Sequence, residues 1–224
     1  AEEVSITSDG HTLKGTLQPD AESNNIAVLQ IAGSGPTDRD GNTVGAIGKN
    51  DSHKLLAAAF KKDHITTLRF DKRGVGASAG ENIKEPELQF NHYVDDAVHW
   101  IEFLKKRGYQ NIILLGHSEG ALIATLTAQK TKVAGVIIVA GAGRNASILL
   151  REQLKAQLPP NLFRRANLTL KALTDGNQVE NTVPSLNNLF RASVQPYLIS
   201  WFKYDPAVEL AKVKVPVLIV QGSS

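Results

Sequence analysis

Residues 116–120 read Gly-His-Ser-Glu-Gly, a spacing that is typical of a serine acting as a nucleophile. In the G-x-S-x-G pattern the serine lies on a tight turn between a strand and a helix. The backbone folds back on itself there, so only small residues fit two positions before and two positions after the serine. Such a serine attacks acyl carbons, and Ser118 is therefore the candidate nucleophile.

Acyl transfer also needs N–H donors for the charge that develops on the attacked oxygen. The helix expected after the serine directs its free N–H groups at the turn, so the amide of Glu119 is one candidate donor. A second donor is expected from the glycine-rich segment AGSGPTDRDGNTVG at 32–45, with the amide of Ser34 preferred and that of Gly35 as second choice.

Charged side chains near these donors leave two interpretations open. The Glu119 side chain either orients a substrate amine or water, or is a solvated carboxylate in the first turn of a helix. Asp38, Arg39 and Asp40 either tie the glycine-rich segment down through charged hydrogen bonds or are solvated.

A serine nucleophile needs a histidine base and an acid that orients it. All six histidines of the sequence precede the end of the motif: His11, His53, His64, His92, His99 and His117. His92, Asp96 and His99 share one helical face, as metal ligands do, but that face is opposite the apolar stripe. A solvated surface is the favoured interpretation, and no metal site is expected.

The elements that must position these residues alternate between apolar runs and helical patterns. A hairpin is expected around Asp9-Gly10. Strands are expected within 25–33, 65–70, 111–116, 133–140 and 215–222, and helices within 52–63, 89–108, 119–130 and 205–214, the first of these helices capped by Asp51. This α/β order predicts a mostly parallel twisted sheet with helices on both faces and ligands at the carboxyl ends of its strands.

One long segment interrupts this alternation. It holds three amphipathic stretches separated by Pro159-Pro160 and Pro184. We expect a core domain formed by 1–143 and 204–224 and a helical cap insertion at 144–203. The cap would turn apolar residues toward a substrate, namely Leu186, Phe190, Leu198, Trp201 and Phe202. The alternative is an ordinary helical excursion that completes the core.

The composition argues against several classes of function. The 224 residues carry 25 basic and 22 acidic side chains without a basic block, which argues against nucleic-acid binding. No run approaches the roughly 18 apolar residues of a membrane span. Without cysteine there is no disulfide and no thiolate site. The start at Ala1 fits either a cleaved signal peptide or a simple boundary of the given sequence, and export is slightly favoured. The sequence does not indicate the oligomeric state.

Three motifs together resemble the α/β-hydrolase superfamily: GHSEG at 116–120, AGSG at 32–35 and DKRGVGAS at 71–78. GSGPTDRDG at 33–41 more closely resembles a branch of bacterial carboxylesterases neighbouring the serine aminopeptidases. The resemblance implies an ester-hydrolysing enzyme without a cofactor, with Ser118 as nucleophile and the Ser34 and Glu119 amides as oxyanion hole. It also implies a site-shaping loop that contains Asp71, Arg73, Gly74, Gly76 and Ser78.

The same resemblance implies a chain order of serine, acid and histidine, with the acid after the seventh strand and the histidine after the eighth. The seventh strand is expected at 215–222, and neither Asp175 nor Asp205 follows a strand. We therefore expect the triad Asp and His beyond residue 224. The alternatives are an aminopeptidase-like or amidase serine hydrolase and, from another class, a non-catalytic binding module on a hydrolase fold.

Overall fold

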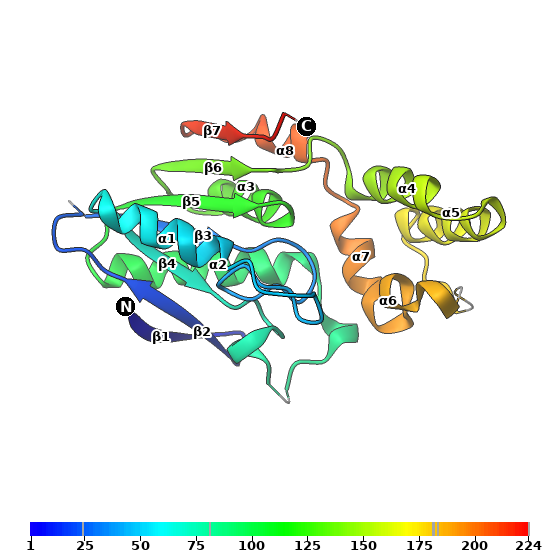
Figure 1. Ribbon diagram of the computed structural model, residues 1–224, viewed down its shortest axis with the longest axis horizontal. Helices are drawn as coiled ribbons and strands as arrows, with labels where there is room; N and C mark the ends of the chain where they lie inside the picture. Colours follow the sequence, from blue (N-terminus) through cyan, green and yellow to red (C-terminus); the bar gives the residue numbers. More distant parts are fainter. Residues whose placement is uncertain (24, 81, 181, 183, 224) are drawn as a thin grey trace. The chain divides into compact units, whose positions relative to one another are not determined.

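The computed structural model describes residues 1–23, 25–80, 82–180, 182 and 184–223, and divides the chain into two compact units (Figure 1). The first, here called the sheet unit, contains 1–83, 93–142 and 210–224. The second, here called the helical unit, contains 84–92 and 143–209. No described helix combines the length and the apolar character needed to cross a bilayer.

The sheet unit is built on seven strands in the order β1-β2-β4-β3-β5-β6-β7. Strands β3 to β7 run parallel, while β1 and β2 form an antiparallel hairpin whose second strand pairs with β4. Their bounds are Glu2–Ser8, His11–Gln18, Ile26–Ile31, Thr66–Phe70, Asn111–His117, Gly135–Val139 and Val217–Val220. The expected hairpin and the expected parallel sheet are confirmed.

The hairpin turns at Asp9 and Gly10, which both have positive φ angles of 47° and 79°. Two successive residues of this kind match the right-handed twist of the flanking strands, which is why Asp-Gly is favoured there. The central strands β3 and β4 are almost wholly buried, because helices cover both of their faces.

The sheet unit contains α1 (Ser52–Lys62), α3 (Glu119–Lys130) and most of α2 (Phe90–Lys106), whereas α8 (Pro206–Leu210) belongs to the helical unit except for its last residue. Figure 1 shows α1 on one face of the sheet and α2 and α3 on the other, as right-handed crossovers require. Helix α2 buries the stripe expected from its periodicity: Phe90, Val94, Ala97, Ile101 and Leu104.

One helix start differs from its prediction. Asp51 does precede α1, but its side chain makes no cap hydrogen bond and its backbone is left-handed, with φ of 47°. Its carboxylate instead accepts a hydrogen bond from Asn42 Nδ2 at 2.7 Å. The residue therefore fastens the preceding loop rather than the helix, because its left-handed backbone is not the extended conformation of a side-chain cap.

The helical unit contains α4 (Ala146–Gln157), α5 (Pro160–Thr174), α6 (Asn187–Phe190) and α7 (Gln195–Trp201). Asn145 caps α4 by accepting a hydrogen bond from the Ser147 amide at 2.9 Å. The third expected amphipathic stretch, 185–202, is not continuous. Pro196 lies in the first turn of α7, where a missing N–H is tolerated, and so a new helix begins there.

Candidate active site

Ser118 lies on the turn between β5 and α3, and its backbone is strained. Its φ and ψ angles are 53° and −117°, a region that residues with a side chain rarely occupy. A Cβ added to Gly116 would lie 2.1 Å from the Gly120 carbonyl oxygen, so the chain does fold back on itself here. The turn thus has the geometry that the GHSEG motif predicts.

The turn packs on the end of β3. A Cβ on Gly120 would lie 2.3 Å from the Ile31 carbonyl oxygen, and a Cβ on Gly33 would lie 3.3 Å from that of Ser118. On the other side, the Ser118 amide donates to the Val139 carbonyl of β6 at 2.9 Å. The half-buried serine is therefore held between the carboxyl ends of two neighbouring strands.

The loop after β3 runs beside the serine. Ser34 and Gly35 are exposed, and the Ser34 carbonyl accepts a hydrogen bond from the Thr37 hydroxyl at 2.9 Å. Among the described residues, no acceptor takes the Ser34 N–H. This amide is thus free to bind an oxygen at the site.

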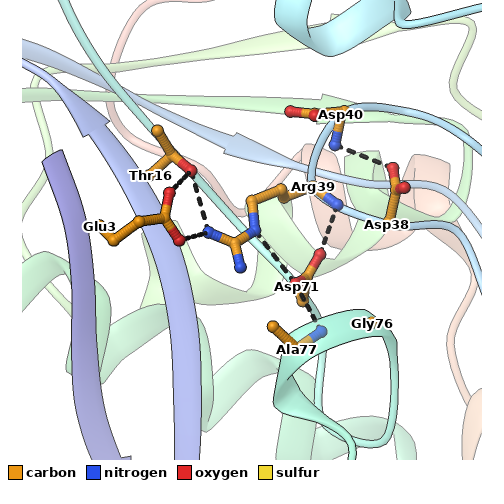
Figure 2. A pocket seen from close by; sticks show the side chains of 8 residues that line it. All are labelled: Glu3, Thr16, Asp38, Arg39, Asp40, Asp71, Gly76 and Ala77. Atoms are coloured by element: carbon orange, nitrogen blue, oxygen red, sulfur yellow. Dashed lines mark hydrogen bonds and ion pairs between the residues drawn. The ribbon is translucent and has the colours of Figure 1, made fainter. Parts of the chain in front are cut away.

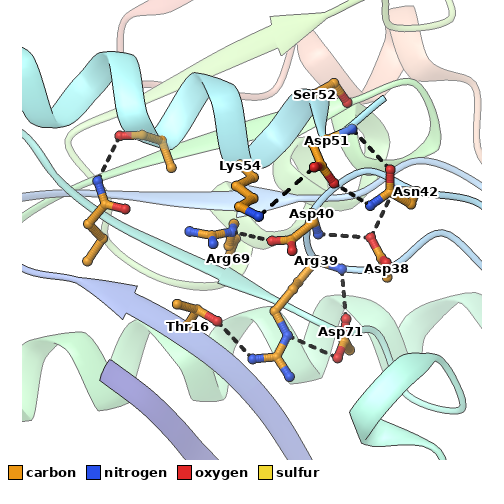
Figure 3. A network of polar contacts seen from close by, with 12 residues as sticks. Thr16, Asp38, Arg39, Asp40, Asn42, Asp51, Ser52, Lys54, Arg69 and Asp71 are labelled. Atoms are coloured by element: carbon orange, nitrogen blue, oxygen red, sulfur yellow. Dashed lines mark hydrogen bonds and ion pairs between the residues drawn. The ribbon is translucent and has the colours of Figure 1, made fainter. Parts of the chain in front are cut away.

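Figure 3 shows how the charged part of this loop is fixed. The Asp38 carboxylate accepts hydrogen bonds from the amides of Asp40 and Asn42 at 2.9 and 2.8 Å. Asp40 in turn pairs with Arg69 of β4 at 2.7 Å. Of the two interpretations of these charges, the tied-down loop is therefore the correct one.

Arg39 anchors the same loop to the hairpin and to the loop after β4. Its guanidinium lies between the carboxylates of Glu3 and Asp71, at 2.7 and 3.0 Å. These residues line a polar cavity of about 330 Å³, shown in Figure 2, together with Thr16, Asp38, Asp40, Gly76 and Ala77. The carboxylates around this cavity already bind Arg39, Arg69 or backbone amides.

The segment 71–78 contains the residues expected to shape the site. Asp71 accepts hydrogen bonds from the amides of Arg39 and Ala77, at 2.7 and 2.9 Å. Gly76 has a φ of 52°, and a Cβ there would lie 2.8 Å from the Asp71 carboxylate. Gly74 also has a positive φ, of 80°. Both glycines are needed for the loop to close around Asp71.

Arg73 and Asp96 form a buried ion pair at 2.5 Å, and Asp96 also accepts from the Ser8 hydroxyl. Burial raises the pKa of Asp96, and the hydrogen bond from Arg73 opposes this. The favoured interpretation of the 92–99 face as a solvated surface is therefore wrong at Asp96. Sequence spacing along α2 did not reveal the arginine that draws this carboxylate inward.

Lys72 is a site residue that sequence reasoning missed. Its side chain is 2% exposed and its ammonium lies 3.0 Å from the Glu119 carboxylate, which is equally buried. The same ammonium donates to the Gly33 carbonyl. The interpretation of Glu119 as a solvated carboxylate is therefore wrong, while its role in orienting a substrate amine or water stays a prediction. The sequence did carry one signal for Lys72. A carboxylate within a tight turn such as GHSEG requires a cation nearby when it is buried.

The histidines of the sheet unit have other neighbours. The rings of His53 and His117 meet edge to face with centroids 5.9 Å apart, while His64 contacts Asp20 and His99 contacts Ser8. Burial, with a smaller effect of His117, lowers the pKa of His53 to about 4. The expectation that the triad base lies beyond residue 224 stays a prediction.

A family model described as serine aminopeptidase, S33, matches residues 45–224. The chain belongs to this family. Esterase EstD of Thermotoga maritima is 27% identical to this S33 family member over 232 residues, which cover 99% of the chain and 51% of that protein. The chain thus spans about half the length of the curated relative it matches.

Solved structures place this S33 family member in the α/β-hydrolase fold. The α/β hydrolase GrgF from Penicillium sp. sh18 superposes with a TM-score of 0.61 at 24% identity, covering 98% of this chain and 79% of that one. Est1E from Butyrivibrio proteoclasticus, solved with ferulic acid bound, superposes with a TM-score of 0.62 at 17% identity, covering 98% of this chain and 78% of that one. Proline iminopeptidase of Mycobacterium smegmatis superposes with a TM-score of 0.61 at 14% identity, covering 97% of this chain and 80% of that one.

Proposed function

We propose that the protein is a serine hydrolase that cleaves carboxylic esters through an acyl-enzyme on Ser118, without a cofactor. The observation that carries the proposal is the strained backbone of Ser118, with φ of 53° and ψ of −117°, at the junction of β5 and α3. Strain of this kind persists where the surrounding packing enforces it, and it concentrates at active sites. The curated relative named an esterase supports the same activity.

In the proposed reaction the Ser118 hydroxyl attacks the ester carbonyl carbon and gives its proton to a histidine. The tetrahedral intermediate expels the alcohol, which takes the proton back, and leaves an acyl-enzyme. Water then attacks the acyl carbon and releases the acid and the free serine. The histidine, and the Asp that orients it, are expected beyond residue 224.

The oxyanion of the intermediate is assigned to the backbone amides of Ser34 and Glu119, with Gly35 as second choice for the first donor. The exposed Ser34 amide without an acceptor and the position of Gly33 beside Ser118 support the first assignment. The place of Glu119 as first residue of α3 supports the second, because the first N–H groups of a helix are directed out of its N-terminal end, toward Ser118. The 144–203 segment is proposed as the cap.

Peptide or amide hydrolysis is the second candidate, favoured by the family description. An aminopeptidase needs an anionic or polar group that recognises the free amino terminus of its substrate. The Glu119 carboxylate, next to the nucleophile, is already engaged by Lys72 at 3.0 Å. This pairing neutralises a carboxylate beside the nucleophile and so supports ester substrates.

The first experiment asks whether Ser118 is a nucleophile. The full-length gene product is treated with a fluorescent fluorophosphonate, beside the Ser118→Ala variant as control. We expect stoichiometric labelling of the wild type and none of the variant. Equal labelling of both proteins, or labelling of neither, would contradict the proposal, and the second result would favour a non-catalytic binding module.

The second experiment separates esters from amides. Turnover of p-nitrophenyl butyrate is compared with turnover of aminoacyl-p-nitroanilides by the same preparation, each corrected for the Ser118→Ala background. An ester reacts more easily than an anilide on any serine hydrolase, so ester turnover alone decides nothing. A higher kcat/KM on the anilides would make the protein an aminopeptidase.

A further inference from the structure

Lys72 is a buried charge beside the nucleophile turn, and the proposed reaction does not use it. Its side chain is 2% exposed, and its ammonium group contacts the Gly33 carbonyl, the Glu119 carboxylate at 3.0 Å and the Tyr93 ring, whose centroid is 5.0 Å away. Burying a lysine is costly unless its charge is compensated. The residue is therefore held at a defined point between three segments of the sheet unit.

The contact with Gly33 acts on one of the proposed oxyanion donors. The Gly33 carbonyl and the Ser34 N–H belong to the same peptide group, which is trans like every described peptide bond. In a planar trans peptide these two groups point in opposite directions. An ammonium that binds the carbonyl therefore fixes the plane of the peptide and leaves the Ser34 N–H directed away from it.

The same contact strengthens the N–H as a donor. A cation on the carbonyl oxygen draws electron density through the amide and makes its N–H more positive, as in chains of hydrogen bonds that polarise one another. In a buried setting this effect is larger than in water. The benefit to the reaction arises when negative charge forms on the substrate oxygen.

The contact with Glu119 acts on the other proposed donor. The ion pair attaches the ammonium to the first residue of α3, whose amide is the second N–H of the proposed oxyanion hole. One side chain thus links the two backbone segments whose N–H groups must converge on one oxygen. Lys72 thus adds a charged link to the direct packing of the same two segments at Gly33 and Gly120.

We propose that Lys72 is the positioning residue of the oxyanion hole, orienting and polarising the Gly33–Ser34 peptide and tying it to the Glu119 end of α3. The proposal rests on the proposed function of Ser118. It is distinct from a purely structural role, in which Lys72 would serve only to neutralise the buried Glu119 carboxylate.

The first test is the Lys72→Met variant of the full-length protein, which keeps the volume of the side chain and removes its charge. The expected result with p-nitrophenyl butyrate is a kcat lowered about 10- to 100-fold, less than the full loss of a donor. KM should change little, since the oxyanion contact forms in the transition state. Inactivation by the fluorophosphonate should slow by a similar factor.

A double variant separates positioning from structure. Lys72→Met combined with Glu119→Gln leaves no unpaired buried charge, so its Tm should recover most of what Lys72→Met alone loses. If Lys72 acts on the Gly33–Ser34 peptide, kcat stays low in the double variant although Tm recovers. A double variant that regains wild-type kcat together with Tm overturns the proposal.

Chemical rescue provides a second measurement that does not depend on the stability of these variants. The 224 residues contain no cysteine, so Lys72→Cys introduces one thiol into this part of the protein. Alkylation with 2-bromoethylamine in denaturant, followed by refolding, adds an aminoethyl group and restores an ammonium at the lysine position. We expect kcat to rise about tenfold over a mock-treated sample of the same variant.

The controls make the two proposals separable. If the wild type shows no Ser118-dependent ester turnover, both the proposed function and the role of Lys72 are wrong. If the wild type turns over esters but Lys72→Met keeps its kcat, or aminoethylation fails to raise the kcat of Lys72→Cys, only the role of Lys72 is wrong.

Discussion

At the scale of single residues, the nucleophile turn depends on two glycines that stand where no side chain fits. Gly116 and Gly120 face each other so closely that a Cβ on the first would lie 2.1 Å from the carbonyl of the second. A carbon and an oxygen cannot approach so closely, so the backbone on either side of Ser118 would have to separate. This contact explains the glycine at 116, and the Ile31 carbonyl oxygen, 2.3 Å from a Cβ on Gly120, explains the glycine at 120.

Replacing Gly116 with alanine should therefore lower the free energy of unfolding by about 2–3 kcal/mol, the cost of forcing a group into a filled site. Gly80→Ala is a matched control, because its Cβ would meet nothing within 4 Å and its φ is not left-handed. Urea denaturation of both variants measures the difference. Equal stabilities would show that the turn relaxes without cost.

His53 is a second residue whose environment makes a measurable prediction. It is buried on α1 against His117, and its pKa is lowered from 6.5 to about 4 because burial disfavours the charged ring. The unfolded chain therefore binds a proton between these two pH values that the folded protein does not. Folding is favoured by the neutral ring above the unfolded pKa, and this contribution is lost as pH falls toward 4.

For this reason, the wild type should lose about 2 kcal/mol more stability between pH 7 and pH 5 than a His53→Gln variant, which cannot titrate at this position. Parallel urea denaturations at the two pH values give the comparison, and His11→Gln serves as the control at a less buried position. If both histidine variants follow the wild-type pH dependence, the ring of His53 is accessible to protons in the folded state.

At the scale of elements, the Arg73–Asp96 pair fastens the loop after β4 to α2. Both side chains are buried, at 4% and 0% exposure. Replacing Asp96 with asparagine removes the buried counter-charge and leaves Arg73 with the more exposed carboxylate of Asp9 at 3.0 Å, which should cost about 3 kcal/mol, the lower end of the range for a broken buried pair. The neighbouring Asp95 pairs with Lys130 at the surface, and so Asp95→Asn should change stability by less than about 1 kcal/mol. Thermal and urea unfolding of both variants check the contrast.

Elements of the sheet unit could be predicted from the sequence wherever one short-range pattern decides the structure. The apolar run of β5, the GHSEG turn and the stripe of α2 each carry their own signal. What could not be predicted depends on partners distant in the chain. Lys72 is 47 residues from Glu119, and Arg73 is 23 residues from Asp96. Spacing within one element gives no information about such pairs, so buried charges were interpreted as solvated.

At the scale of the whole molecule, α2 belongs to both compact units. Its first residues, with the preceding segment from Lys84, cluster with the helical unit, and its remainder covers the sheet. Phe90 explains this division. It is fully buried, and within the helical unit its ring stacks on Trp201 at 6.0 Å and lies close to the rings of Tyr197 and Tyr204.

Replacing Phe90 with alanine should therefore affect the helical unit more than the central sheet. The lost aromatic contacts and the cavity should cost about 3–5 kcal/mol of local stability. Native-state hydrogen exchange should show faster exchange of the α7 amides than in the wild type, while β3 and β5 keep their protection, because compact units of a protein commonly open as separate cooperative segments. Phe103→Ala, which removes a ring that contacts Trp100 on the part of α2 in the sheet unit, is the matched control. Equal loss of protection in α7 and β5 for the Phe90 variant would show that the two units unfold as one.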